Sequence, residues 1–590
     1  MLRFLCFLLM ASVVHADEKP ALTPGNYIVY YAFSSTAPEQ AFGLIKVEKK
    51  GGKLTGELLD KPAGLPADFE SFTVDGRLVE VVFDLGGRKL SFEGFVDAKN
   101  PKLANGSFGD DKLLSRGKIV STEHEKLEKE DLVVKIEAPA DYAKAAKLAS
   151  AVAQLKAQAQ RAKSAESKEK LKEKLAEVEK DQAEQAPAIY KAILEKNADS
   201  PVVVDAVLGL MRMGEKAGKP ADAVAWLKAA ETFAEPLGTR FYADVLMKSG
   251  EAMKEQKGFE TTAINTLEKT LKLLGAKATT AQQVRVLKAI HTAQEKAGKA
   301  DAAKQTEARL AKLEDQLDKD YLAKVPPFKP RAFEGRKGKS ERVAVFELFT
   351  GAQCPPCVAS DVAFDALLKS YPATELVLLQ YHMHIPGPDP LTNPSTIARW
   401  DYYKEKFPQA MRGTPSTVFN GKPSNGGGGG MGQAKAMFDN YTATINPLLE
   451  EETTIKITGS AALKGEKISI KVDVDGVPEP GENVKLRVIL VEDTVKHVGG
   501  NGLRFHHQIV RSFPGGIEGT AFTDKKLAKT VDVDLAEVRK GLKKYLDEYD
   551  EDDPFENLEK LLDLKKLRIV VLVQDDTSRA ILQAFQMDVK

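Results

Sequence analysis

The chain has 590 residues, of which 43% are hydrophobic and 29% charged, so it is long enough for about four globular domains rather than one core. Its 85 basic and 85 acidic side chains balance to a net charge of zero. This balance gives no global attraction to nucleic acid or to anionic lipid, so we expect no nucleic-acid partner.

The first sixteen residues have the layout of a secretory signal peptide. One positive side chain, Arg3, precedes an apolar run from Phe4 to Val14, and the small residue Ala16 stands before charged residues. This run is too short to span a bilayer, and no later stretch approaches the ~20 apolar residues of a membrane-spanning helix. We therefore expect an exported product, soluble in the periplasm or outside the cell. Cys6 comes too early in the run to be a lipid-attachment site and would be lost with it.

Residues 20–122 predict an antiparallel sheet. Short apolar runs alternate with turn signals such as Gly51-Gly52 and Gly86-Gly87, which accept the positive φ that hairpin turns require. Either a small barrel or a sandwich would bury these runs. The segment contains no metal-ligand cluster and no pairing of a nucleophile with a base, so a docking or structural role is favoured over catalysis.

Residues 138–324 are rich in Ala, Lys, Glu, Leu and Gln, a composition typical of helices. The first part, 142–185, is polar on most faces and predicts a long exposed hairpin or a weak coiled coil. Beyond it, Gly218, Gly258 and Gly298 are spaced 40 residues apart, and each is expected to end one helix and precede the next. This pattern resembles tetratricopeptide solenoids, which bind protein partners on a concave surface. A plain helical spacer is the alternative, with equal weight.

A proline-rich linker, 326–330, leads into the segment 340–450, which carries the remaining two cysteines in Cys354-Pro355-Pro356-Cys357. A short buried strand precedes this motif and a helix follows it. The free N–H groups and positive dipole at a helix start favour an anion, so Cys354 should ionise more readily than a free cysteine of pKa ~8.5. We expect its sulfur to be the more exposed of the two, and Cys357, one turn inside, to resolve a mixed disulfide.

The order of strand, Cys-x-x-Cys and helix, followed by Gly413-Thr414-Pro415-Ser416 before another apolar strand, resembles the thioredoxin-like superfamily. The phrase from Glu347 to Cys354 is most similar to secreted and envelope members that carry a C-terminal β-sandwich. The resemblance implies a redox-active Cys354–Cys357 disulfide with Cys354 as the nucleophile. It also implies a cis Thr414-Pro415 bond beside the cysteines, where the backbone binds the substrate chain.

Two positions depart from the family's pattern. Gln353 stands where the family has an aromatic residue, and Leu348 stands where it has a buried acid. The neighbouring acid, Glu347, would face the other side of a regular strand.

Two histidines on the next predicted strand are further candidates for the site. His382 and His384 share one strand face, and we expect one of them, like Glu347, to tune Cys354. Binding of copper or another soft metal by the two histidines and the cysteines is a less favoured alternative. A glycine run, 426–430, predicts a loop over the site, because no Lys-Ser or Lys-Thr follows it to hold a nucleotide. No metal or other cofactor is predicted.

The Cys-x-x-Cys pair has two other interpretations. Half of a zinc site is the less favoured one, since zinc requires four ligands and the chain has no second cysteine pair. An inert structural disulfide is the stronger one, because an exported chain would oxidise so short a loop in any case.

Strand patterns return from 452 to 590 and predict a β-sandwich-like domain with an acidic helical insertion at 535–564. The phrases 491–501 and 505–511 resemble the C-terminal part of the same envelope proteins. His506 and His507 are adjacent and would point to opposite faces of a strand, which argues against a metal site there.

The predicted fold is therefore multidomain, with α/β, all-β and all-α parts. It comprises an N-terminal β domain, a helical repeat region, a thioredoxin-like domain and a C-terminal β-sandwich. The preferred function is an exported thiol-disulfide oxidoreductase whose partners are exported protein thiols and disulfides. The alternative is a non-catalytic extracytoplasmic binding or scaffold protein in which the cysteine pair is structural and the solenoid and sheets bind partners.

Overall fold

The computed structural model describes residues 22–85, 88–110, 113–161, 165–424, 427–555 and 561–590. The predicted signal peptide, Cys6 and the Gly86-Gly87 turn lie outside the described residues. The chain divides into two compact units, Met1–Leu317 and Asp318–Lys590. An antiparallel sheet, a helical middle region and a C-terminal sheet region follow one another, so the expected mixture of sheet and helical parts is confirmed.

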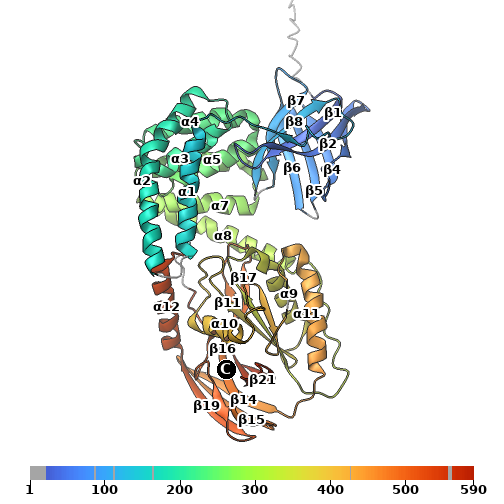
Figure 1. Ribbon diagram of the computed structural model, residues 1–590, viewed down its shortest axis with the longest axis vertical. Coiled ribbons are helices and arrows are strands. Elements are labelled where there is room, and N and C mark those ends of the chain that lie inside the picture. Colours follow the sequence, from blue (N-terminus) through green and yellow to red (C-terminus); the bar gives the residue numbers. More distant parts are fainter. Residues whose placement is uncertain (1–21, 86–87, 111–112, 162–164, 425–426, 556–560) are drawn as a thin grey trace, which may run out of the picture. The chain divides into compact units, whose positions relative to one another are not determined.

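An antiparallel sheet that nearly closes into a barrel begins the first unit (Figure 1). Its strand order is β3-β2-β1-β8-β7-β6-β5-β4, with β9 paired to β2. The predicted turn at Gly51-Gly52 is present, and both glycines have positive φ. Phe42, Phe83 and Phe108 pack together in the interior. The strands are β1 (Gly25–Ala32), β2 (Glu39–Lys50), β3 (Lys53–Asp60), β4 (Asp68–Asp75), β5 (Leu78–Leu85), β6 (Arg88–Val96), β7 (Leu103–Gly109), β8 (Leu114–Thr122) and β9 (Val133–Val134).

The helical region predicted from composition is confirmed. α1 and α2 run side by side (Figure 1), joined by an ion pair of 2.9 Å between Lys156 and Glu179. The three equally spaced glycines lie in the turns before α4, α6 and α8, as expected. The elements are α1 (Tyr142–Arg161), α2 (Ala165–Lys196), α3 (Val202–Met213), η1 (Gly214–Lys216), α4 (Asp222–Ala234), η2 (Glu235–Leu237), α5 (Thr239–Met253), α6 (Glu260–Leu274), η3 (Gly275–Lys277), α7 (Thr280–Lys296) and α8 (Ala300–Lys324).

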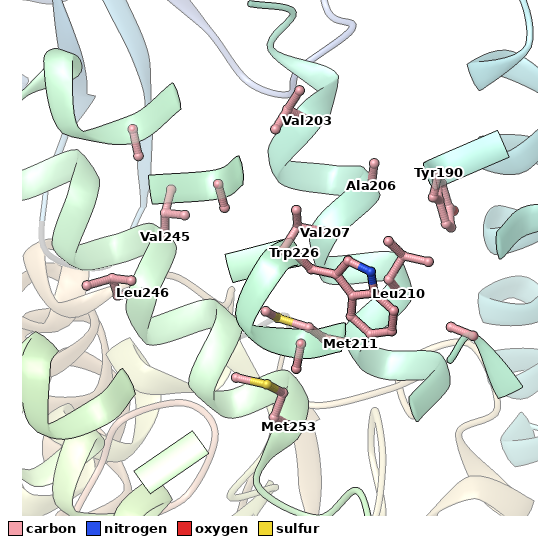
Figure 2. Packing of buried hydrophobic residues seen from close by; sticks show 14 of the residues in the cluster. Tyr190, Val203, Ala206, Val207, Leu210, Met211, Trp226, Val245, Leu246 and Met253 are labelled. Atoms are coloured by element: carbon pink, nitrogen blue, oxygen red, sulfur yellow. The ribbon is translucent and has the colours of Figure 1, made fainter. Parts of the chain in front are cut away.

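The core of this helical region is built from the facing sides of successive helices. Figure 2 shows Trp226 of α4 packed beside Leu210 and Met211 of α3. Tyr190 of α2 belongs to the same cluster, as does Met253 of α5. Each helix pair therefore buries its apolar stripe against its neighbours, which is the way a helical repeat becomes stable.

The second unit is organised around a mixed sheet of order β13-β12-β10-β11-β17-β16-β20-β21, and β18 pairs with β16. Strands β10 and β11 run parallel. The elements are β10 (Ala344–Thr350), η4 (Pro355–Cys357), α9 (Val358–Ser370), β11 (Leu376–His382), α10 (Pro394–Lys406), β12 (Ser416–Phe419), β13 (Lys422–Ser424), η5 (Met431–Gln433), α11 (Ala434–Leu449), β14 (Lys456–Lys464), β15 (Lys467–Asp475), β16 (Gly481–Lys496), β17 (Phe505–Ser512), β18 (Thr520–Phe522), β19 (Leu527–Asp534), α12 (Leu535–Asp552), β20 (Leu567–Asp575) and β21 (Ile581–Asp588).

Helices cover both faces of β10 and β11. On one face, Phe346 packs against Phe364 of α9 and Tyr441 of α11. On the other face, Phe349 packs against Trp400 of α10. The carboxyl end of β10 consequently leads into the loop before α9, which contains the cysteine pair.

The boundary predicted near residues 450–452 does not separate two sheets. Strand β17 pairs with β11 through Gln380 and Ile509, so the C-terminal strands extend the sheet that carries the cysteine loop. A smaller sheet, β14-β15-β19, packs on β16 and β20, so two sheets do face each other in this part. α12 lies within the predicted helical insertion. Alternating apolar residues identify a strand, but they do not identify its partner strand, which is why the sequence suggested two bodies.

Candidate functional site at the cysteine pair

Cys354 and Cys357 form a disulfide whose Cα atoms are 5.4 Å apart, which confirms the predicted pairing. Cys354 follows β10 with extended backbone dihedrals. Pro355 and Pro356 begin a short 3-10 turn, where their missing N–H groups leave no bond unmade, and Cys357 directly precedes α9. The pair therefore stands at a helix start, as the sequence predicted.

Cys354 is the more exposed of the two cysteines, as expected, but at 2% against 0% for Cys357 both are buried, so the expectation that the first sulfur is accessible is wrong. The described part of the glycine run, 427–430, contacts the residues beside the pair. Gly429 N donates a hydrogen bond of 2.6 Å to Pro356 O, and Gly429 O accepts one of 2.9 Å from Ala359 N. The sequence suggested a loop at this place, but not its backbone hydrogen bonds to Pro356 and Ala359.

The segment predicted to bind substrate does contact the first cysteine. The Thr414-Pro415 peptide bond is cis, as expected. Thr414 Oγ1 donates to Cys354 Sγ over 3.4 Å, and the Thr414 carbonyl oxygen lies 3.8 Å from the same sulfur. A residue sixty positions later in the chain is thus brought against the thiol pair.

A buried acid that the sequence reasoning missed lies one helical turn beyond the second cysteine. Asp361 is four residues after Cys357, which directly precedes α9, and this spacing favours neighbouring side chains. Its carboxylate accepts hydrogen bonds from Thr350 Oγ1 at 2.9 Å and from Gln380 Nε2 at 2.8 Å. Burial raises the pKa of Asp361 well above its ordinary value, against the opposing effect of the Thr350 hydrogen bond. An i,i+4 search from Cys357 would have found this residue.

A second buried acid holds the backbone that leads into Cys354. Asp389 Oδ2 accepts from His382 Nδ1 at 2.8 Å and from Ala352 N at 2.6 Å. Burial raises the pKa of Asp389, but the charge and hydrogen bond of His382 and the backbone N–H donors outweigh it and hold this pKa below its usual range. Asp389 lies in a proline-rich loop without a recognisable motif, so no sequence signal pointed to it.

The two histidines proposed for tuning thus reach the site through Asp389. His382 is fully buried and its Nε2 faces Gln380 Oε1 at 3.3 Å. His384 lies just beyond the end of β11, where its Nδ1 accepts from Asp389 N at 3.0 Å. Burial lowers the pKa of His384 to about 4, so it is neutral near pH 7. His384 also stacks on Tyr549 with ring centroids 3.6 Å apart.

Glu347 faces the side of β10 that α10 covers, as strand periodicity predicted. It is fully buried and pairs with Arg399, whose Nε lies 2.8 Å from Glu347 Oε1. Tyr381 donates to the same carboxylate at 2.9 Å, and the Tyr403 hydroxyl also bonds to it. These contacts connect Glu347 with α10 rather than with the thiols.

His506 and His507 point to opposite faces, as predicted. His506 packs against His382 with ring centroids 4.9 Å apart, and burial lowers its pKa well below the ordinary value. His507 Nδ1 lies 2.7 Å from Asp365 Oδ1. Among the described residues, no group of three or more His, Cys, Asp or Glu side chains is arranged to hold a metal ion.

Comparisons with known proteins add little to this geometry. No protein-family model matches the chain, and no curated protein matches it. A protein of Agrobacterium tumefaciens solved by a structural-genomics consortium aligns with 42% of this chain and 96% of its own, at 16% identity and a TM-score of 0.27. HBP35 of Porphyromonas gingivalis aligns with 43% of this chain and 77% of its own, at 13% identity and a TM-score of 0.30. Similarities at this level assign neither a family nor a function.

Across the described ranges, no helix is both long enough and apolar enough to cross a bilayer.

Proposed function

We propose that this chain is an exported thiol-disulfide oxidoreductase of the thioredoxin-like kind, which acts on protein disulfides through Cys354 and Cys357. The supporting observation is that segments far apart in the sequence meet at one point. The disulfide precedes α9, Thr414 contacts Cys354 Sγ, and the buried carboxyl of Asp361 lies one turn beyond Cys357. Buried acids with raised pKa values cluster at functional sites, since a structural core seldom requires an ionisable group.

The proposed reaction has two exchange steps. The Cys354 thiolate attacks one sulfur of a substrate disulfide, forms a mixed disulfide and releases the first substrate thiolate. Cys357 then loses its proton and attacks Cys354 Sγ, which closes the 354–357 disulfide and releases the second substrate thiolate. Two electrons pass to the substrate, and the reverse sequence oxidises a dithiol. The spacing of four residues between Cys357 and Asp361 supports a role for Asp361 as the acceptor of the Cys357 proton.

The burial of both sulfurs favours a second candidate function, a non-catalytic extracytoplasmic binding or scaffold protein. In that case the disulfide is a structural link, and the tetratricopeptide-like helices α3 to α8 bind a protein partner. Loss of so short a cross-link would cost less than the ~3 kcal/mol expected for a fifteen-residue loop, and it would cost the same whichever cysteine is replaced.

Covalent trapping in the exported compartment separates the two functions. Cys357→Ser should accumulate mixed disulfides between Cys354 and exported proteins, because no second thiol remains to release them. Cys354→Ser is the matched control and should trap little, since Cys357 is the more deeply buried of the two cysteines. Equal and negligible trapping by both variants would remove the oxidoreductase proposal and leave the scaffold.

A further inference from the structure

The loop between β16 and β17 reaches the segment that leads into the first cysteine. Asn501 N donates to Ala352 O at 3.0 Å, and Asn501 Nδ2 donates to Gly351 O at 3.3 Å. The neighbouring Gly500 N donates to Gln353 Oε1 at 3.1 Å. A loop 150 residues later in the chain thus binds three consecutive residues immediately before the cysteine pair.

The β16–β17 loop approaches the backbone of Ala352 closely. Both this loop and Asp389 restrain that backbone. A Cβ atom at Gly499 would lie 2.1 Å from Ala352 O, so a side chain there would collide. Ala352 N donates to Asp389 Oδ2, so both polar backbone groups of Ala352 are held. Cys354 N donates to Gly351 O at 3.0 Å, which closes the turn containing the first cysteine.

One carboxylate on α8 connects the two ends of the same loop. Arg504 donates to Asp318 Oδ1 through Nε and Nη2, each at 2.7 Å, and Lys496 pairs with Asp318 Oδ2. Lys496 ends β16, and Arg504 directly precedes β17. Burial raises the pKa of Asp318, but the hydrogen bonds from Lys496 and Arg504 outweigh it and leave the pKa lowered. Asp318 is therefore an ionised group that fixes the base of the loop.

We propose that the β16–β17 loop, residues 497–504, is a positioning element of the thiol site, and that Asn501 and Asp318 are its positioning residues. The loop anchors residues 351–353 and so keeps Cys354 in its buried position. This inference deepens the proposed oxidoreductase function and depends on it for its biological meaning. Its physical consequence is that weakening the loop should increase the access of a reductant to the disulfide.

Reduction by dithiothreitol measures this access without any exported partner. One dithiothreitol thiolate attacks Cys354 Sγ, forms a mixed disulfide and releases Cys357 as a thiolate. The second dithiothreitol thiolate then attacks the reagent's own sulfur in that mixed disulfide, closes the reagent's disulfide and releases Cys354 as a thiolate. The full chain would carry Cys6→Ser, so that the pair provides all of the thiol signal. Acid quenching, alkylation and mass spectrometry then give the rate constant of reduction.

Asn501→Ala should increase this rate constant about tenfold, a change that corresponds to ~1.4 kcal/mol. Asp318→Asn should act in the same direction, and the double variant should show less than the product of the two effects, because both act through one loop. Glu492→Gln is the matched control, since it weakens a buried ion pair of 2.7 Å between Glu492 Oε2 on β16 and Arg511 Nη2 on β17, outside the loop. Its rate constant should remain that of the wild type.

An unchanged rate constant in Asn501→Ala would overturn the proposal, and so would an equal increase in Glu492→Gln, which would indicate general loosening of the unit. Asn501→Ala keeps the backbone hydrogen bond to Ala352, so it decides the question even where Asp318→Asn does not fold. A chain that shows the loop effect but traps no exported protein would keep the positioning role of the loop and lose the oxidoreductase proposal.

Discussion

The substitution Asp361→Asn should change how the stability of the second unit depends on pH. The ordinary pKa of this carboxyl is 3.8, and burial raises it well above that value in the folded chain. Above about pH 4 the unfolded chain has lost this proton while the folded chain retains it, so rising pH lowers the free energy of unfolding by up to ~1.4 kcal/mol per unit. The wild type loses stability in this way until the folded carboxyl ionises. The asparagine variant has no carboxyl at this position and does not lose stability through it.

The hydrogen bonds to Asp361 determine how the stabilities of the variant and the wild type differ near pH 4. Thr350 and Gln380 both donate to Asp361, and an asparagine side chain can accept from one of them while its NH₂ group faces the other. Near pH 4 the variant should therefore be less stable than the wild type by ~1 kcal/mol, the value of one neutral hydrogen bond. As the pH rises from about 4 toward the raised pKa of the folded carboxyl, the wild type loses stability and the variant should overtake it.

Urea unfolding of the oxidised full chain at a series of pH values measures this difference. The chain has two tryptophans, so Trp226→Phe leaves Trp400 as the reporter, and Trp400 packs on Phe349 with ring centroids 5.4 Å apart. Asp389→Asn is the matched control. The pKa of Asp389 is lowered in the folded chain, so its carboxylate stabilises the fold above about pH 4, and its loss should destabilise at every pH tested without a crossing. Parallel pH curves for Asp361→Asn and the wild type would refute the argument.

Three further predictions concern positions away from the thiols. Arg399→Ala should lower the urea midpoint of Trp400 fluorescence by an amount equivalent to ~3–5 kcal/mol, because Glu347 would remain buried without its partner. Gly209→Ala should lower the thermal midpoint of the helical region by the equivalent of ~1–3 kcal/mol, since its Cβ would lie 2.5 Å from the Tyr190 ring. Gly541→Ala should instead stabilise α12 by up to ~1 kcal/mol in urea unfolding, because a Cβ there meets nothing within 4 Å. An unchanged midpoint in any of these three variants would contradict the argument for that variant.

The secondary structure was largely predictable because its signals are local. Helix composition and the glycines at 218, 258 and 298 predicted the helix pairs, and alternating apolar residues predicted most strands. The pairing of β17 with β11 was not predictable, since Gln380 and Ile509 are brought together by tertiary structure. A strand with two buried faces carries no pattern that identifies its neighbour.

The same distinction applies to the candidate site. Cys354 and Cys357 form a local motif, and a resemblance drew attention to Thr414-Pro415, so the sequence found all four residues. Asp361 could have been found by helical spacing. Asp389, Asn501 and Asp318 could not, because each contacts a segment far away in the sequence and no local pattern identifies that tertiary contact.

The way in which the disulfide is covered bears on the choice between an enzyme and a structural link. Backbone contacts hold the chain around the pair: Gly429 bonds to Pro356 and Ala359, and residues 499–501 contact residues 351–353. Glycine loses more conformational freedom on ordering than any other residue, so segments rich in it are held in place less firmly than packed side chains would be. Such segments open locally at a free energy below that of global unfolding. A structural disulfide does not require segments that can open. A thiol pair that is buried at rest and must contact a partner does require them.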